Sequence, residues 1–197
     1  MILSEEREIV LITAKKALAE GLVRLSFGNF SVYDPKTGYI CITPSGIDYS
    51  ELYPEDIAVI DIEGNEIAGK HKPSIEKAMH IEIYKSRQDS LAICHTHSTY
   101  ATAWACTAEE LPVLVAELAS RTGKSIPKVP YFEPGSDLLA QAAAKALKKS
   151  DVALLSNHGI IAVGKTMKLA YANALITEEG AMVAYLASRI GRTIEIE

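Results

Sequence analysis

The sequence predicts a single α/β domain over residues 1–197, in which helices cover both faces of a central, largely antiparallel β-sheet. Four strand-like stretches precede residue 70 and are joined by short turns, which favours hairpins over the long crossovers of a parallel sheet. Helical patterns lie before and after these strands and can cover the sheet. A chain of 197 residues without linkers, repeats or low-complexity segments favours one domain over two.

The first half of the chain is expected to form one helix followed by hairpins. The helix begins at Ser4, a plausible N-cap, and ends at Gly21. Its expected buried stripe consists of Ile9, Val10, Thr13, Ala14, Ala17 and Leu18. Three of the four strand-like stretches are 26–33, 39–42 and 57–62, with turns over 34–38, 43–46 and 63–65.

The second half alternates helices with strands. Helices are expected over 74–87 with Ser74 as N-cap, from Ser98 onward, over 136–149 with Ser136 as N-cap, and over 166–190 up to Gly191. Strands are expected over 91–97 and on either side of Asn157-His158-Gly159. The segment 110–134 receives no assignment, because four prolines interrupt it.

Composition and charge exclude several classes of protein. Apolar residues make up 48% and charged residues 23%, which is typical of a globular chain. No apolar run approaches the roughly 18 residues of a membrane helix, and the N-terminus does not resemble a signal peptide. Three irregularly spaced cysteines indicate a reducing cytoplasm rather than a disulfide framework. A net charge of −5 without a long basic run argues against nucleic acid as a partner.

Three histidines lie at or beside strand ends. His95 and His97 are two residues apart on a strand, so both rings project to the same side and can share one ion. Such a pair is a weak signal, since two polar residues leaving a buried strand look the same. His158 precedes Gly159, which is expected to let the backbone turn sharply. Three neutral imidazoles with an open position are typical of a catalytic zinc site. The other histidines, His71 and His80, are assigned to the surface or to a helix.

A second group of residues suits an anion. The small polar stretches Gly28-Asn29 and Ser45-Gly46, with Ser74 at a helix start, offer amides and hydroxyls that can bind a phosphate. Each stretch taken alone is equally well an ordinary turn. Glu76 follows in the first helical turn, where a carboxylate normally complements the helix dipole. It gains importance only if that helix end faces the histidines.

Five motifs together resemble one known family. They are Gly28-Asn29-Phe30-Ser31, Ile42-Thr43-Pro44-Ser45-Gly46, Lys72-Pro73-Ser74-Ile75-Glu76, His95-Thr96-His97 and Asn157-His158-Gly159. Their order and spacing resemble the class II aldolase/adducin family, and within it the L-fuculose-1-phosphate aldolases most closely. The resemblance implies one zinc per subunit, held by His95, His97 and His158. It implies Glu76 as the acid/base, which also contacts the metal when no substrate is bound. It further implies a phosphate pocket of Gly28, Asn29, Ser45, Gly46, Ser74 and Ile75, and a homotetramer with active sites between subunits.

The sequence departs from this family pattern at two places. Ile75 stands where the resembled aldolases have a second serine, so one hydroxyl for the phosphate is missing, although the backbone N–H remains. Those aldolases also borrow a tyrosine from the region equivalent to 111–124 and another from a C-terminal tail. This chain has no tyrosine in 111–124 and none after Tyr185, so the general acid for the aldehyde oxygen is unassigned.

The predicted activity is zinc-dependent, reversible cleavage of a ketose 1-phosphate into dihydroxyacetone phosphate and a short aldehyde, with zinc as Lewis acid and Glu76 moving the proton. Two enzymes of the same fold remain as alternatives: a pentulose-5-phosphate 4-epimerase and a methylthioribulose-1-phosphate dehydratase. The epimerase needs a further carboxylate and tyrosine that have no evident counterpart here. A non-catalytic, adducin-like binding module is the third alternative, and the intact histidine set with Glu76 argues against it.

Overall fold

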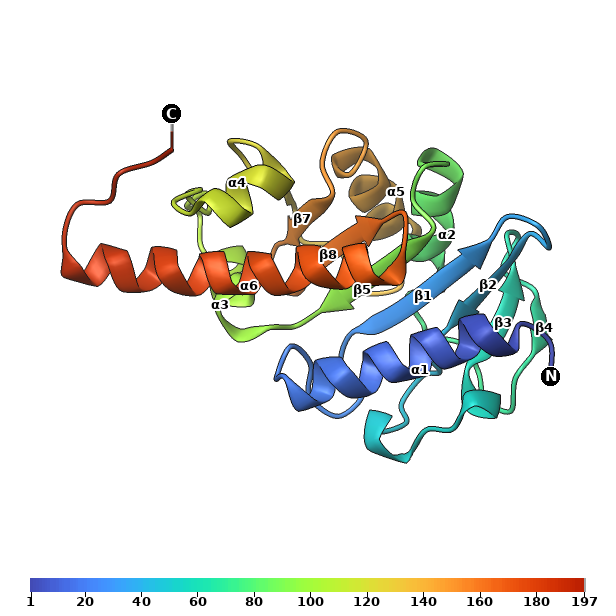
Figure 1. Ribbon diagram of the computed structural model, residues 1–197. Helices are drawn as coiled ribbons and strands as arrows, with labels where there is room; N and C mark the ends of the chain where they lie inside the picture. Colours follow the sequence, from blue (N-terminus) through green and yellow to red (C-terminus); the bar gives the residue numbers. More distant parts are fainter. Residues whose placement is uncertain (197) are drawn as a thin grey trace.

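An eight-stranded sheet forms the centre of the computed structural model, which describes residues 1–196 (Figure 1). The strands lie in the order β4-β3-β2-β1-β5-β8-β7-β6, and all neighbours are antiparallel except β6 and β7, which are parallel. Their bounds are β1 Asn29–Asp34, β2 Tyr39–Ile42, β3 Ala58–Asp61, β4 Glu66–Ala68, β5 Ala92–Thr96, β6 Lys128–Val129, β7 Val152–Leu155 and β8 Gly159–Gly164. The prediction of a largely antiparallel sheet is confirmed.

Helices cover both faces of this sheet, as the sequence predicts (Figure 1). One face carries α1 (Ser4–Ala19), α3 (Thr99–Ala105), α4 (Ala116–Thr122) and α6 (Met167–Ile190), together with the short 3-10 helices η1 (Tyr49–Glu51) and η2 (Pro54–Asp56). The other face carries α2 (Lys77–Ser86) and α5 (Asp137–Ala146), which pack against each other. In the central strand β5, Cys94 belongs to the first core and Ile93 to the second. Successive residues of this strand therefore face opposite layers.

The N-cap predicted for α1 and the start predicted for α2 are wrong. The N-cap of α1 is Leu3, with a φ of 50°, and not Ser4. Helix α2 begins at Lys77 with Glu76 as its N-cap, three residues after the expected start. The backbone before it is held by another segment, because the Ser74 N–H donates to the Thr43 carbonyl at 3.0 Å. A contact distant in sequence thus outweighs the local capping signal.

The predicted stripe of α1 is largely correct, with one clear error. Ile9 is 44% exposed, whereas Leu11 and Arg7 lie on the buried face. Arg7 can lie there because its guanidinium donates to the Glu55 carbonyl at 3.3 Å. One guanidinium nitrogen is therefore paired, which offsets part of the cost of burial, while Nε has no hydrogen-bond partner among residues 1–196.

The segment 110–134, left unassigned from the sequence, contains α4 and β6. Strand β6 lies beside β7 through two backbone bonds: Leu154 N–H donates to the Pro127 carbonyl at 2.9 Å, and Ser156 N–H donates to the Val129 carbonyl at 2.9 Å. The prolines around it lack N–H groups, but an edge strand can pair through its carbonyls alone. A two-residue edge strand of this kind leaves no periodic pattern in the sequence.

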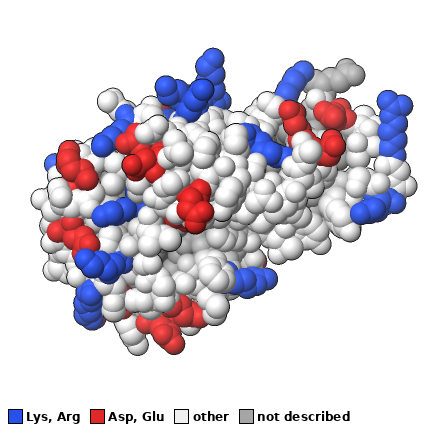
Figure 2. Space-filling view, turned by 180° about the vertical axis from the view of Figure 1, so that it is seen from behind, with Lys and Arg blue, Asp and Glu red and all other residues white. Residues whose placement is uncertain are grey.

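The surface carries charges of both signs. On the face seen in Figure 2, lysine and arginine side chains alternate with aspartate and glutamate, and neither sign fills the view. None of the helices within residues 1–196 combines the length and apolar character that crossing a membrane requires. The three cysteines are free thiols, Cys41 and Cys94 buried and Cys106 exposed.

Candidate active site

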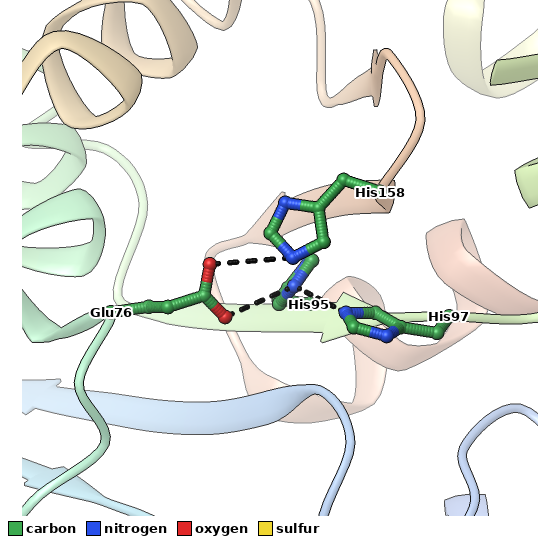
Figure 3. Close-up of side chains that lie close together, drawn as sticks. All are labelled: Glu76, His95, His97 and His158. Carbon is green, nitrogen blue, oxygen red and sulfur yellow. Dashed lines mark hydrogen bonds and ion pairs between the residues drawn. The ribbon is translucent and has the colours of Figure 1, made fainter. Parts of the chain in front are cut away.

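Four side chains from three distant parts of the chain converge near one end of β5. Glu76 lies at the start of α2, His95 in β5, His97 just after it, and His158 in the turn between β7 and β8 (Figure 3). Each offers one ligand atom, and these atoms all lie within 4.8 Å of one another. The structure thus brings together the carboxylate and the three imidazoles that the sequence analysis singled out.

His95 is held in one orientation by the neighbouring strand. Its Nδ1 lies 2.7 Å from the Ile160 carbonyl of β8. A carbonyl only accepts, so Nδ1 carries the proton and the neutral ring presents an unprotonated Nε2 to the site. The side chain is fully buried, and the Phe27 ring stacks on the adjacent His97 with an interplanar angle of 4°. Both imidazoles of the pair are therefore fixed before any ligand binds.

The turn that presents His158 works differently from the sequence expectation. The residue in the left-handed region is Asn157, with a φ of 56°, and not Gly159. Gly159 is needed instead because β5 passes very close to it. A Cβ at this position would lie 2.3 Å from the Thr96 carbonyl oxygen and 3.0 Å from Cδ2 of His97. The glycine lets the strand that carries His95 and the turn that carries His158 approach each other.

We expect Gly159→Ala to destabilise the protein by about 1–3 kcal/mol, because the methyl group forces the β5 backbone away. Metal binding should weaken as well, since the shift separates His97 from His158. Denaturant unfolding and metal titration measure the two effects. Gly191→Ala is the matched control, because a Cβ there meets no heavy atom of residues 1–196 within 4 Å. An unchanged free energy of unfolding in Gly159→Ala would show that the β5 backbone can shift to make room for the methyl group without cost, which would contradict this prediction.

Glu76 is 5% exposed and lies between two of the histidines. Its Oε2 is 3.2 Å from Nε2 of His95 and accepts from Nδ2 of Asn29 at 2.8 Å. Its Oε1 is 3.5 Å from Nε2 of His158. The two oxygens therefore have different surroundings: Oε2 is held by the Asn29 amide beside His95, and Oε1 is directed toward His158.

The charges of these residues are coupled. Burial by itself would raise the pKa of Glu76, but His95, His158 and the Asn29 hydrogen bond outweigh it and hold that pKa below its usual range. Burial would lower the pKa of His95, yet the Glu76 carboxylate outweighs it and raises that pKa. Burial, and then positive charge at His95, lower the pKa of His97 to about 3 and that of His158 to about 4. The cluster thus stabilises a positive charge beside the carboxylate.

The cluster fits a divalent transition metal. Nε2 of His95 lies 2.9 Å from Nε2 of His97 and 3.2 Å from Oε2 of Glu76. Oε1 of Glu76 is buried and has no hydrogen-bond partner among residues 1–196. A cation among these atoms would accept the His95 lone pair and neutralise the carboxylate. Imidazole nitrogens and carboxylate oxygens are the ligands that zinc and related metals bind in proteins.

The residues predicted to hold a phosphate line a cavity of about 350 Å³ beside this cluster. Its walls contain Gly28, Asn29, Ser45, Gly46, Ser74 and Ile75, together with Glu76, His97 and His158. The Ser74 hydroxyl accepts from the Glu76 N–H at 3.2 Å, which leaves its own proton available. Asn29 is less free than expected, because it is 3% exposed and its amide already donates to Glu76.

His80 was assigned only to the surface or a helix, and the structure places it fully buried in α2, close to the site. Its ring contacts Asn29 and Ser31 of β1. A sequence signal for this was present. His80 lies four residues after Glu76 in a helical stretch, and Ser31 lies two residues after Asn29 in a strand, so each pair shares a face. His71, in contrast, is exposed and lies 3.3 Å from Asp56.

Comparisons with known proteins agree with this geometry. A model of the family described as Class II Aldolase and Adducin N-terminal domain matches residues 8–185. The chain is 37% identical over 191 residues to the 5-deoxy-D-ribulose 1-phosphate aldolase of Bacillus thuringiensis serovar kurstaki, covering 97% of this chain and 89% of that one. It is 38% identical over 161 residues to the L-fuculose phosphate aldolase of Methanocaldococcus jannaschii, covering 82% and 85%. A solved L-fuculose 1-phosphate aldolase matches with a TM-score of 0.95 at 36% identity, covering 100% and 92%.

These matches extend over the sheet and both helical layers. The matched range 8–185 contains all eight strands and the Glu76–histidine cluster. The family predicted from the sequence is the one that these comparisons match, so that prediction is confirmed. The chain therefore belongs to the class II aldolase and adducin family.

Proposed function

We propose that this protein is a zinc-dependent aldolase that reversibly cleaves a ketose 1-phosphate into dihydroxyacetone phosphate and a short aldehyde. One observation carries the proposal: the polar loops suited to a phosphate and the cluster suited to a metal open into the same cavity. A substrate with a phosphate at one end and adjacent oxygens further along can occupy both. The names of the two relatives, each an aldolase of a sugar phosphate, support the reaction class.

In this proposal some residues bind the phosphate of the substrate and another transfers the proton. The amides of Gly28, Gly46 and Ile75 and the hydroxyl of Ser74 would hold the phosphate, with the start of α2 favouring its charge. The keto oxygen and the neighbouring hydroxyl oxygen would then lie at the histidine cluster. When bound, the divalent ion supplies a Lewis acid for these oxygens. Glu76, whose Oε1 has no hydrogen-bond partner among residues 1–196, would return the proton to the carbon that loses the aldehyde, and remove it in the reverse direction.

The cavity also indicates a substrate with an apolar end. Phe27 is 56% exposed, lines the cavity and stacks on His97. Its exposed ring favours a methyl group over a hydroxymethyl group nearby. The substrates in the names of the two relatives, 5-deoxyribulose 1-phosphate and fuculose phosphate, both end in a methyl group. We therefore place terminally deoxygenated ketose 1-phosphates first among the candidates.

A substrate panel tests this function. The metal-loaded protein is offered ketose 1-phosphates and 5-phosphates, with and without a terminal methyl group, and the products are identified by mass and by an assay coupled to dihydroxyacetone phosphate. Aldol cleavage of a 1-phosphate is the expected result. A 5-phosphate that changes configuration without cleavage would indicate the epimerase instead, and loss of water would indicate the dehydratase.

Ser74→Ala should raise the KM for the sugar phosphate about tenfold and change kcat little. The hydroxyl contacts the phosphate in the ground state and the transition state alike, and a hydrogen bond to a charged group contributes on this scale. Steady-state kinetics with competing inorganic phosphate measure the effect. Ser74→Thr keeps the hydroxyl and serves as the control. A large fall in kcat at unchanged KM would mean that Ser74 acts through Glu76 rather than on the phosphate.

We also propose that the protein works as a homotetramer with active sites between subunits. The C-terminal half of α6 projects beyond the sheet (Figure 1) and exposes apolar side chains, namely Val183, Tyr185, Leu186 and Ile190. Apolar surface of this kind is typical of subunit contacts. Such an assembly would also bring side chains of a second copy of this chain to the cavity, and we propose that the unassigned general acid is one of them. Light scattering of the purified protein tests the tetramer.

A further inference from the structure

A chain of buried polar side chains connects Glu76 to the far end of α2. Nδ2 of Asn29 donates to Oε2 of Glu76 at 2.8 Å, and Nε2 of His80 lies 2.5 Å from Oδ1 of Asn29. On the other side of the ring, Nδ1 of His80 lies 2.6 Å from Oγ of Ser31, which lies 2.7 Å from Oη of Tyr84. His80 is fully buried, and the mechanism described so far makes no use of it.

The chemistry of each group fixes the direction of these hydrogen bonds. An amide oxygen only accepts, so the His80 Nε2 that faces Asn29 must carry a proton. A neutral ring then leaves Nδ1 as an acceptor, and the Ser31 hydroxyl donates to it. Burial, and then positive charge at His95, lower the pKa of His80 to about 3, so the ring is neutral at physiological pH. Each donor in the chain therefore points toward a defined acceptor.

The His80 N–H fixes the orientation of the Asn29 side-chain amide. Asn29 pairs with His95 across β1 and β5, which places its side chain beside the cluster. If the amide turned over, its oxygen would face the Glu76 carboxylate and repel it. The His80 N–H prevents this, because it holds the amide oxygen on the opposite side. With Oε2 held by Asn29 beside Nε2 of His95, the plane of the carboxylate is fixed and Oε1 is directed toward Nε2 of His158.

We propose that His80 is a positioning residue which, through Asn29, fixes the Glu76 carboxylate in the orientation that proton transfer requires. The inference rests on the proposed role of Glu76 and adds a residue outside the cavity to the catalytic apparatus. A buried imidazole and amide are costly to keep where an apolar side chain could pack, and that cost is offset only when every polar atom is paired. Here the paired network ends on the one carboxylate of the cluster.

The test compares two replacements of His80. Glutamine places an amide nitrogen near the position of Nε2 and keeps the donor, whereas leucine fills a similar volume without one. In zinc-replete protein, His80→Leu should slow the exchange of the methylene proton of dihydroxyacetone phosphate with deuterated water by on the order of tenfold to a hundredfold. KM and metal content should change little, and His80→Gln should retain most of the rate. Equal losses in both variants would overturn the proposal.

Two further variants separate positioning from a general loss of structure. Tyr84→Phe removes a buried hydroxyl of the same network but leaves the His80–Asn29 contact, so exchange should stay close to normal. A loss as large as that of His80→Leu would overturn the proposal. In a Glu76→Gln background, adding His80→Leu should cause no further loss of exchange, because the carboxylate it positions is already gone. Independent, multiplying losses would show that His80 acts elsewhere.

A measurement that needs no turnover reads the arrangement directly. Nitrogen-15 NMR of the metal-loaded protein should show His80 as the neutral form with its proton on Nε2. A ring with its proton on Nδ1 alone could not donate to Asn29, and a charged ring could not accept from Ser31. Either result would overturn the proposal. Failure of the proposed function looks different, because wild-type protein would then catalyse no proton exchange at all. If instead the wild type and His80→Leu exchange the methylene proton equally fast, the proposed function is supported and the proposed role of His80 is wrong.

Discussion

Glu76→Gln should lower kcat by on the order of a hundredfold or more, the usual scale for loss of a general acid–base group. Glutamine keeps the size of the side chain and can still accept from Asn29, but it cannot carry a proton between solvent and substrate carbon. The three imidazoles remain, so the ion should stay bound. Proton exchange of dihydroxyacetone phosphate in deuterated water measures the step without any aldehyde present, and metal analysis of the same sample checks the ion.

Glu5→Gln is the matched control for this change. Glu5 is an exposed glutamate in the first turn of α1, so its loss removes only a favourable charge at a helix start, worth at most about 1 kcal/mol of stability. Turnover should be unaffected. If zinc-replete Glu76→Gln exchanges the proton at the wild-type rate, another group moves it. Glu76 would then be a metal ligand or a helix-end charge only.

His95→Ala and His158→Ala should each lose both the bound ion and the activity, while purified wild-type protein should contain close to one divalent ion per chain. The reason is the geometry: each imidazole supplies one of the few ligand atoms that converge within 4.8 Å. Neutral imidazoles bind the ion in their unprotonated form, so chelation and reloading should switch activity off and on. Elemental analysis identifies the metal, and zinc is the expected one.

The two substitutions differ in their effect on the fold, which gives the experiment an internal check. His95 is fully buried and bonded to Ile160, so its removal also leaves a cavity and an unpaired carbonyl, whereas His158 is partly exposed. Loss of the ion in a stably folded His158→Ala protein is therefore the decisive result. His71→Ala should change neither metal content nor activity, because His71 is exposed and pairs with Asp56, outside the cluster. Full metal content after removal of two of the three cluster histidines would contradict the site.

Features of the fold that depend on local contacts could be predicted from the sequence. The cap at Ser136 is an example, because its side chain accepts from the backbone N–H of Leu139 in the same helix. The turn after β1 is another, since Asp34 accepts from the N–H groups of Lys36 and Thr37. In each case the side chain that accepts the hydrogen bond and the backbone N–H that donates it are at most three residues apart in the sequence.

Features that depend on distant contacts could not be predicted in this way. The start of α2 depends on the backbone hydrogen bond between Ser74 and Thr43, which lie far apart in the sequence. The spacing of His95 and His97 predicts a shared face, but only the pairing of β5 with β8 brings His158 beside them. Glu76 entered through the family resemblance, and His80 was overlooked because its partners lie on β1. A sequence shows which residues lie on the same face of one helix or strand, but which faces pack against each other depends on the whole fold.

The position of β5 at the centre of the sheet has a consequence for motion. All five of its residues are buried, and it is hydrogen-bonded to β1 on one side and β8 on the other. Amides in such a strand exchange with solvent only when large parts of a protein open together, whereas surface loops open on their own. Ser45 and Gly46, in contrast, lie exposed on a loop. His95, proposed as a metal ligand, is therefore expected to move only when the sheet opens, whereas Ser45 and Gly46, proposed to contact the phosphate, can move on their own.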